Sequence, residues 1–130
     1  MHVYRSAARE QGVEALPPLS ESYPTMEILS GDPRQSGRID VSGEDDALFA
    51  GVWECTKGSF RFTYTFTELA TILAGRIAVT DAEGARHELA VGDSFLVKQG
   101  ETVTWEILED MRKSYFLFAE AGVPAGSAAG

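Results

Sequence analysis

Apolar and polar side chains alternate along two stretches of the chain. Every second residue between positions 60 and 66 is aromatic, and Val103, Trp105 and Ile107 alternate with polar residues in the same way. Because successive side chains of a strand point to opposite faces, each stretch predicts a β-strand with an apolar inner face and a polar outer face. The inward aromatic residues of the first stretch are Phe60, Phe62, Tyr64 and Phe66.

The turn-forming residues that separate the apolar runs indicate the fold class. From about residue 39 onward, short β-rich runs are separated by Gly, Asp and Ser at intervals of about 8 to 12 residues, which is typical of an all-β sandwich or barrel. Residues 81–84 predict a hairpin turn and residues 92–93 a second tight turn. Weak helical patterns occur only at residues 6–14 and 44–48.

The chain divides into three segments. Residues 1–30 are mixed in period and contain three prolines, which predicts an extended arm rather than a core element. Residues 31–120 are expected to form one β domain, since 130 residues with 44% hydrophobic content suit a single core. The small-residue tail at 121–130 is expected to fray.

Charge and composition exclude several classes of partner. The formal charge of −9, from 20 acidic and 11 basic residues, opposes binding to nucleic acid or to an anionic membrane surface. The first residues lack the apolar run of a secretion signal, and no segment approaches the roughly 20 apolar residues of a membrane span. One cysteine and no asparagine agree with a reducing compartment. We therefore expect a cytoplasmic protein.

A set of short motifs occurs in a fixed order along the chain. They are Gly31-Asp-Pro33, Trp53-Glu-Cys55, Gly58-x-Phe60-x-Phe62-x-Tyr64, Glu68, Gly75-Arg76, Gly92-Asp93, Gly100-x-x-x-Thr104-Trp105 and Arg112-Lys113-x-Tyr115. With them the chain resembles the cupin superfamily over about residues 38–120. It is similar to the small single-domain cupins grouped with the (S)-ureidoglycine aminohydrolase cupin domain. The resemblance implies an all-β, antiparallel double-stranded β-helix, the cupin or jelly-roll barrel.

The histidines of metal-binding cupins are missing. In those proteins a first motif supplies His-x-His and a glutamate before a glycine, and a second motif supplies another histidine. When the chain is aligned on Glu68 and Gly75, these histidine positions fall on Phe62, Tyr64 and a position near Val103. Zinc or iron sites need three or four good donors, so we expect no bound metal and no cofactor.

Glu68 is the first candidate for a catalytic or binding residue. An inward carboxylate among aromatic side chains loses hydration, which raises its pKa unless a partner compensates. Glu68 is therefore a candidate general acid or base, with a structural ion pair as the alternative. Candidate partners for that pair are Arg38, Arg76 and Lys113.

The aromatic residues and the cysteine also allow two interpretations each. Trp53, Tyr64 and Trp105 form either a cage that stacks on a planar or sugar-like ligand, or plain core filling. Cys55 is interpreted as an inert buried thiol, because no histidine in the neighbouring sequence would activate it as a nucleophile. His87 lies in the predicted hairpin and is interpreted as a surface histidine.

Together these observations predict a metal-independent pocket that binds a small polar metabolite. Its candidate lining residues are Arg38, Trp53, Cys55, Phe62, Tyr64, Glu68, Val103, Trp105 and Lys113. The alternative is an enzyme similar to ureidoglycine aminohydrolase that acts on an amino or ureido compound, with Glu68 as the proton-transfer group. A structural or partner-binding barrel is a third possibility. The resemblance also implies a homodimer, which would cover open sheet edges.

Overall fold

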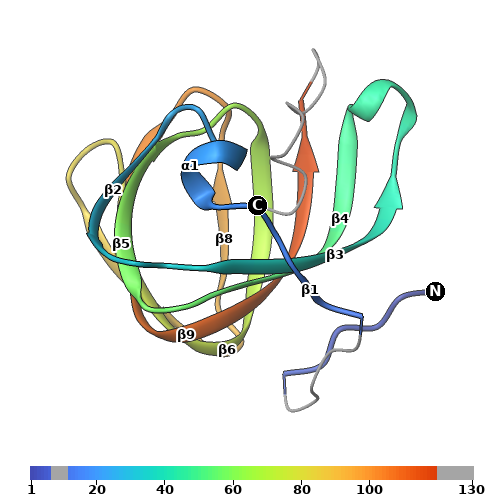
Figure 1. The fold of residues 1–130 in the computed structure, drawn as a ribbon, viewed down its shortest axis with the longest axis horizontal. Helices are drawn as coiled ribbons and strands as arrows, with labels where there is room; N and C mark the ends of the chain where they lie inside the picture. The colour runs from blue at the N-terminus through green and yellow to red at the C-terminus, as the bar shows by residue number, and fades with distance from the viewer. Residues whose placement is uncertain (7–11, 120–130) are drawn as a thin grey trace.

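The computed structural model describes residues 1–6 and 12–119, and within these ranges it confirms the all-β expectation (Figure 1). A short helix and a 3₁₀ turn accompany the strands. The described elements are β1 (Glu14–Ala15), α1 (Leu19–Ser22), β2 (Met26–Gly31), β3 (Gln35–Ser42), η1 (Glu44–Asp46), β4 (Leu48–Cys55), β5 (Gly58–Thr63), β6 (Thr67–Thr80), β7 (Arg86–Ala90), β8 (Ser94–Val97) and β9 (Thr102–Phe118).

Two long strands, β6 and β9, hold the barrel together. They pair with each other along most of their length, and the described pairings of the sheet are antiparallel. The second half of β9 also pairs with β4, whereas its first half pairs with β5. The first half of β6 pairs with β8 and its second half with β7. Because β6 and β9 pass through both halves of the sheet, the sheet curls into the barrel seen in Figure 1.

The bend of β6 requires a glycine. Gly75 has φ +79°, and a Cβ at this position would lie 2.3 Å from the carbonyl oxygen of Asp110. A side chain is therefore excluded where β6 crosses from one half of the barrel to the other, beside register shifts in the β6–β9 pairing. The turns predicted at residues 81–84 and 92–93 are confirmed, and η1 confirms the helical turn expected near residue 44.

The predicted inner faces are confirmed. Phe60 opposes Trp105 and Phe62 opposes Val103 in the β5–β9 pairing, and all four side chains are buried. The rings of Phe60 and Trp105 stack with centroids 5.7 Å apart. Burying one side chain of this size contributes about 2 kcal/mol, so these cross-strand pairs make up much of the core. Tyr64 and Phe66 follow the end of β5 and are buried too.

The lead-in segment differs from the prediction. The expectation that residues 1–30 hold no core element is wrong, because Leu19 and Tyr23 are buried in the core and β2 pairs with β5. α1 lies across an open end of the barrel (Figure 1), where the Tyr23 ring contacts Phe62. A helix of one turn is too short to show a helical period, so its buried residues left no sequence signal.

Two expectations fall outside the described residues: the tail at 121–130 and most of the helical pattern at 6–14. Within the described part of the chain, no helix has both the length and the apolar character of a membrane span.

Candidate functional site

Lys113 and Glu68 form an ion pair inside the barrel. The Lys113 Nζ lies 2.6 Å from Glu68 Oε2, and the two side chains are 2% and 0% exposed. In the β6–β9 register Lys113 opposes Ile72 rather than Glu68, so the pair forms because both long side chains extend into the interior. Of the three partners considered for Glu68, Lys113 is the one that the fold brings to it.

Tyr64 completes the hydrogen bonding of the carboxylate. Its hydroxyl donates to Glu68 Oε1 at 2.9 Å. The backbone holds Tyr64 in place, because its N–H donates to the Glu101 carbonyl and its carbonyl accepts from the N–H of Gly100, each at 2.8 Å. Glu68 therefore has one partner on each oxygen, a phenol and an ammonium.

Aromatic rings surround the Lys113 ammonium on its other sides. The Nζ lies 4.5 Å from the ring centroid of Trp53, 4.8 Å from that of Trp105 and 5.7 Å from that of Phe95. Ring faces attract a cation at such distances. The interior thus forms a cation-binding cage whose occupant is the chain's own lysine.

Burial shifts the titration of all three polar groups. Burial raises the pKa of Glu68, and the nearby Lys113 opposes that rise. Burial lowers the pKa of Lys113, and Glu68 opposes that fall. Burial and then the Glu68 charge raise the pKa of Tyr64, while an interaction with the Trp105 side chain lowers it. Such a cluster is typical of a functional site, because a buried ion pair is a poor way to stabilise a fold.

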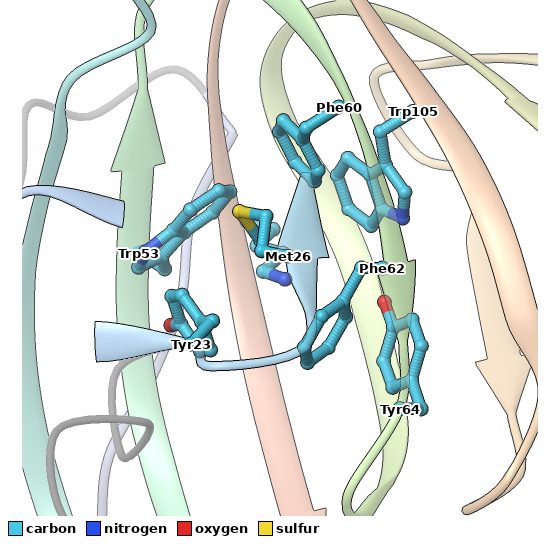
Figure 2. A pocket seen from close by; sticks show the side chains of 8 residues that line it. Tyr23, Met26, Trp53, Phe60, Phe62, Tyr64 and Trp105 are labelled. Atoms are coloured by element: carbon cyan, nitrogen blue, oxygen red, sulfur yellow. The ribbon is translucent and has the colours of Figure 1, made fainter. Parts of the chain in front are cut away.

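The walls around this cluster leave almost no free space. Figure 2 shows Met26 of β2 among aromatic rings from β4, β5 and β9, together with Tyr23, which follows α1, and Tyr64, which follows β5. The cavity between them measures about 10 Å³, which is the room of a single water molecule. Its lining residues are Tyr23, Met26, Trp53, Phe60, Phe62, Tyr64, Trp105 and Lys113. In this conformation the side chains themselves fill the barrel.

Three of the lining residues, Tyr23, Met26 and Phe60, were not among the lining residues predicted from the sequence, although Phe60 was predicted to face inward. Tyr23 is 2% exposed, its ring lies 5.3 Å from that of Phe62, and its hydroxyl has no hydrogen-bond partner among the described residues. Tyr23 and Met26 come from the proline-containing segment at residues 1–30, where no alternation of apolar and polar residues indicates an inner face. An aromatic residue between prolines was the one available hint.

Gln35 connects α1 to the cavity wall and was also missed. Its side-chain amide donates to the carbonyl of Pro17 and to the hydroxyl of Ser22, both at 2.8 Å. Its side-chain oxygen accepts the indole N–H of Trp53 at 2.9 Å. One buried glutamine thus joins the helix that closes the barrel to an aromatic residue that lines it.

The prediction that Arg38 contacts the pocket requires correction. Gln35 and Gly37 occupy the inner positions of β3, so Arg38 points outward, where its Nε lies 2.7 Å from Asp40 Oδ1. The hydrogen bond from Arg38 is the largest effect and lowers the pKa of Asp40. Burial opposes it, and a hydrogen bond from Tyr4 lowers the pKa further. Arg76 is exposed on β6 and does not reach Glu68 either.

Val103 and Cys55 are buried as expected, but neither lines the cavity. Burial raises the pKa of the Cys55 thiol from 9.0 to about 12, although the nearby Lys113 lowers it. A thiol that stays protonated is a poor nucleophile, which agrees with the interpretation as inert. His87 is exposed, with Nε2 2.9 Å from Asp81 Oδ2.

The residues present do not fit a metal ion. The positions that the alignment on Glu68 and Gly75 predicts for the histidines carry Phe62, Tyr64 and Val103, which offer one phenol, and the Lys113 ammonium already contacts the Glu68 carboxylate. Among the residues that the structure describes, no three His, Cys, Asp or Glu side chains gather in a way that could hold a metal.

Comparison with known proteins identifies the fold. Residues 42–115 match the family described as the EutQ-like cupin domain. The Clostridium difficile EutQ protein is 15% identical, with TM-score 0.57 over 66% of this chain and 68% of that chain. A putative ethanolamine utilization protein Q from Salmonella typhimurium is 19% identical, with TM-score 0.56 over 68% and 70% of the two chains.

A Pseudomonas syringae protein of unknown function, which belongs to the DUF861 family, superimposes over more of the chain. It is 21% identical, with TM-score 0.71 over 86% of this chain and 45% of that chain. Our chain thus spans less than half of that protein. No match was found among curated protein sequences. At these identities the structural similarity shows a shared cupin fold.

Proposed function

Because this chain belongs to the family of EutQ-like cupin domains, we propose that its barrel binds a small polar metabolite without a metal, at the Lys113–Glu68 pair. The observation that carries the proposal is that pair, held at 2.6 Å and closed off from solvent. Apolar residues of similar volume would stabilise a barrel as well or better, so stability alone does not explain the pair. Polar groups on an aromatic inner face suit recognition of a ligand.

The chemistry of the interior favours an uncharged ligand. Lys113 and Glu68 compensate each other, so a charged molecule would bring a buried charge without a partner. The rings of Trp53, Phe62 and Trp105 offer stacking surfaces, and the Tyr64 hydroxyl offers a polar contact. Because the cavity holds about 10 Å³, a larger ligand must displace one of the walls.

A thermal-shift screen of uncharged polar metabolites, with calorimetry on the hits, tests the proposal. The control is the double variant Glu68→Leu/Lys113→Met, which keeps similar volumes and removes the ion pair. We expect hits that stabilise the wild-type protein and not the double variant. Equal shifts in both proteins, or none in the wild type, would contradict binding at the pair.

The second candidate is an enzyme similar to ureidoglycine aminohydrolase that acts on an amino or ureido compound. The observation that favours it is the raised pKa of Glu68, caused by burial, in direct contact with two other proton carriers, Tyr64 and Lys113. Ammonia release from ureido compounds, lost in Glu68→Gln, would support this candidate. Stoichiometric manganese, zinc or iron in the purified protein would contradict the metal-independent pocket and would favour this second candidate.

A second copy of the chain is the partner that we propose for the outer surface. Five apolar side chains lie in register across neighbouring strands on the outer face, and we call them the outer apolar stripe. They are Val41 of β3, Ala50 of β4, Phe116 of β9, Leu69 of β6 and Leu96 of β8. Four of the five side chains are strongly exposed. An uncharged stripe lets two copies of charge −9 meet without placing like charges in contact.

A further inference from the structure

Tyr23 enters the barrel from outside its wall. The residue caps α1 at its C-terminal end, and its ring packs edge-on to Phe62 with an interplanar angle of 71°. It is 2% exposed and lines the cavity beside Trp53 and Met26 (Figure 2). Tyr23 thus lines the cavity although it does not belong to a strand.

The hydroxyl of Tyr23 is buried without a hydrogen-bond partner among the described residues. Burial raises its pKa, and electrostatic interactions with Glu68, Tyr115 and Cys55 raise it further. A buried hydroxyl without a hydrogen-bond partner destabilises the folded state. Packing stabilises the Tyr23 ring in this position, whereas its hydroxyl forms no stabilising hydrogen bond with the described residues.

The element that carries Tyr23 is short, and it is held in place by the burial of its residues and by the Gln35 side chain. α1 has four residues, lacks a side-chain N-cap bond and lies between Pro18 and Pro24. Its outer side borders a surface groove of about 520 Å³, lined by the Pro17 to Ser20 segment and by Arg34 among others. The helix therefore has room to withdraw from the barrel.

From these observations we infer that Tyr23 occupies the place of the ligand, and that the ligand is an uncharged, planar, single-ring molecule with a hydroxyl or amide group. This inference rests on the proposed function and specifies its ligand class. The ring of the ligand would occupy the space beside Phe62 that the Tyr23 ring now fills. The polar group of the ligand would lie where the Tyr23 hydroxyl lies, and a free molecule can shift to form the hydrogen bond that this hydroxyl lacks. Charge is excluded because Lys113 and Glu68 already balance.

The test supplies the tyrosine side chain as a free molecule. p-Cresol is titrated by calorimetry into Tyr23→Ala and into the wild-type protein, with Leu19→Ala as the control, since Leu19 is a buried apolar residue of the same helix. We expect p-cresol to bind Tyr23→Ala at least about tenfold more tightly than either other protein, a difference of about 1.4 kcal/mol. Cyclohexanol and benzoate should bind Tyr23→Ala weakly, because one is not planar and the other is charged.

Equal binding of cyclohexanol or benzoate, or no preference of p-cresol for Tyr23→Ala over Leu19→Ala, would overturn the inference. If Tyr23→Ala does not fold, Tyr23→Leu is the replacement variant, because it keeps an apolar contact with Phe62 and still removes the phenol. The wild-type protein labelled with 3-fluorotyrosine provides a second readout, in which a ligand that displaces Tyr23 shifts its fluorine resonance.

This readout separates the inference from the proposed function. A hit of the metabolite screen that depends on Lys113 and Glu68 but leaves the Tyr23 resonance unchanged would overturn the inference and leave the proposed function standing. Absence of any wild-type hit would contradict the proposed function itself, whatever p-cresol does in the variant.

Discussion

At the residue scale, Lys113 is the buried counter-charge of Glu68. Its ammonium neutralises Glu68 and lies against the rings of Trp53 and Trp105. Removing one charge of a buried pair leaves the other without compensation, whereas replacing both with apolar groups removes the penalty altogether. The pair should therefore behave as a unit when it is mutated.

The first prediction compares single and double replacements of the pair. Lys113→Met should lower the free energy of unfolding by about 3–5 kcal/mol, and Glu68→Leu/Lys113→Met should restore most of it. Urea denaturation of the variants measures both. The exposed pair Arg61 and Glu27, 3.0 Å apart, is the control, and Arg61→Met should cost less than about 1 kcal/mol. Additive losses in the double variant would refute the coupling.

The second prediction concerns alkaline pH. Because burial raises the pKa of Cys55 from 9.0 to about 12, the folded protein keeps a proton that the unfolded chain loses. The stability from this thiol is complete below pH 9.0 and is lost as the pH rises toward 12, by about 1.4 kcal/mol per pH unit. Buried tyrosines act in the same direction above 10.0, and Lys113 in the opposite one.

The comparison with Cys55→Ala isolates the thiol from these other groups. The free energy of unfolding of the wild-type protein should fall relative to that of Cys55→Ala over a pH series that starts at 9.0. Parallel curves for the two proteins would show that the thiol ionises alike in the folded and unfolded states.

At the element scale, α1 covers one end of the barrel. Its backbone bonds are few, with Ser22 donating to Pro18 and Tyr23 to Leu19. The side chain of Gln35 adds the bonds to Pro17 and Ser22 that tie the helix to β3 and to Trp53. Since the helix is too short to be stable by itself, these bonds and the burial of its residues keep it in place.

The third prediction is that Gln35→Ala loosens α1. Removal of this amide leaves the Trp53 N–H without an acceptor and frees the helix, at a cost of about 1–3 kcal/mol. Amide hydrogen exchange at residues 19–23 should then accelerate by about tenfold or more, since 1.4 kcal/mol corresponds to a factor of ten. Thr71→Ala, which removes an exposed bond to Ser94, is the control and should leave α1 unchanged. Unchanged exchange in Gln35→Ala would show that packing alone holds the helix.

At the scale of the whole molecule, an acidic protein carries an uncharged stripe across one outer face. Leu69 lies within this stripe, between Leu96 and Phe116 in the strand register, and is 52% exposed. Exposed apolar side chains that are contiguous over neighbouring strands are typical of interaction sites, whereas scattered ones are ordinary. A two-fold interface would bring the stripe of one copy against that of the other.

The fourth prediction tests this interface. The wild-type protein should be a dimer by light scattering coupled to size-exclusion chromatography, and Leu69→Asp should be a monomer, because it places two like charges within the interface. Val91→Asp is the matched control, since Val91 is 51% exposed in a turn outside the stripe and should leave the dimer intact. A monomeric wild-type protein, or a dimeric Leu69→Asp, would contradict the proposed interface.

Much of the barrel and part of its site could be predicted from the sequence. The inward faces around Phe62 and Trp105 followed from alternation, and Glu68 was identified as a buried acid that needs a partner. Lys113 was one of three candidates, because choosing it required knowing how β6 and β9 meet. Tyr23 and Gln35 were missed, since each acts through contacts with distant strands that leave no local pattern.

The sequence by itself determined which strand faces turn inward, where the tight turns lie and that histidine ligands are lacking, because these depend on backbone periodicity and residue type at single positions. Tertiary structure alone decided that Lys113 neutralises Glu68, that Arg38 points away and that Tyr23 closes the barrel. Those contacts join residues far apart along the chain, and their geometry is set by strand register and curvature, which only the assembled barrel provides.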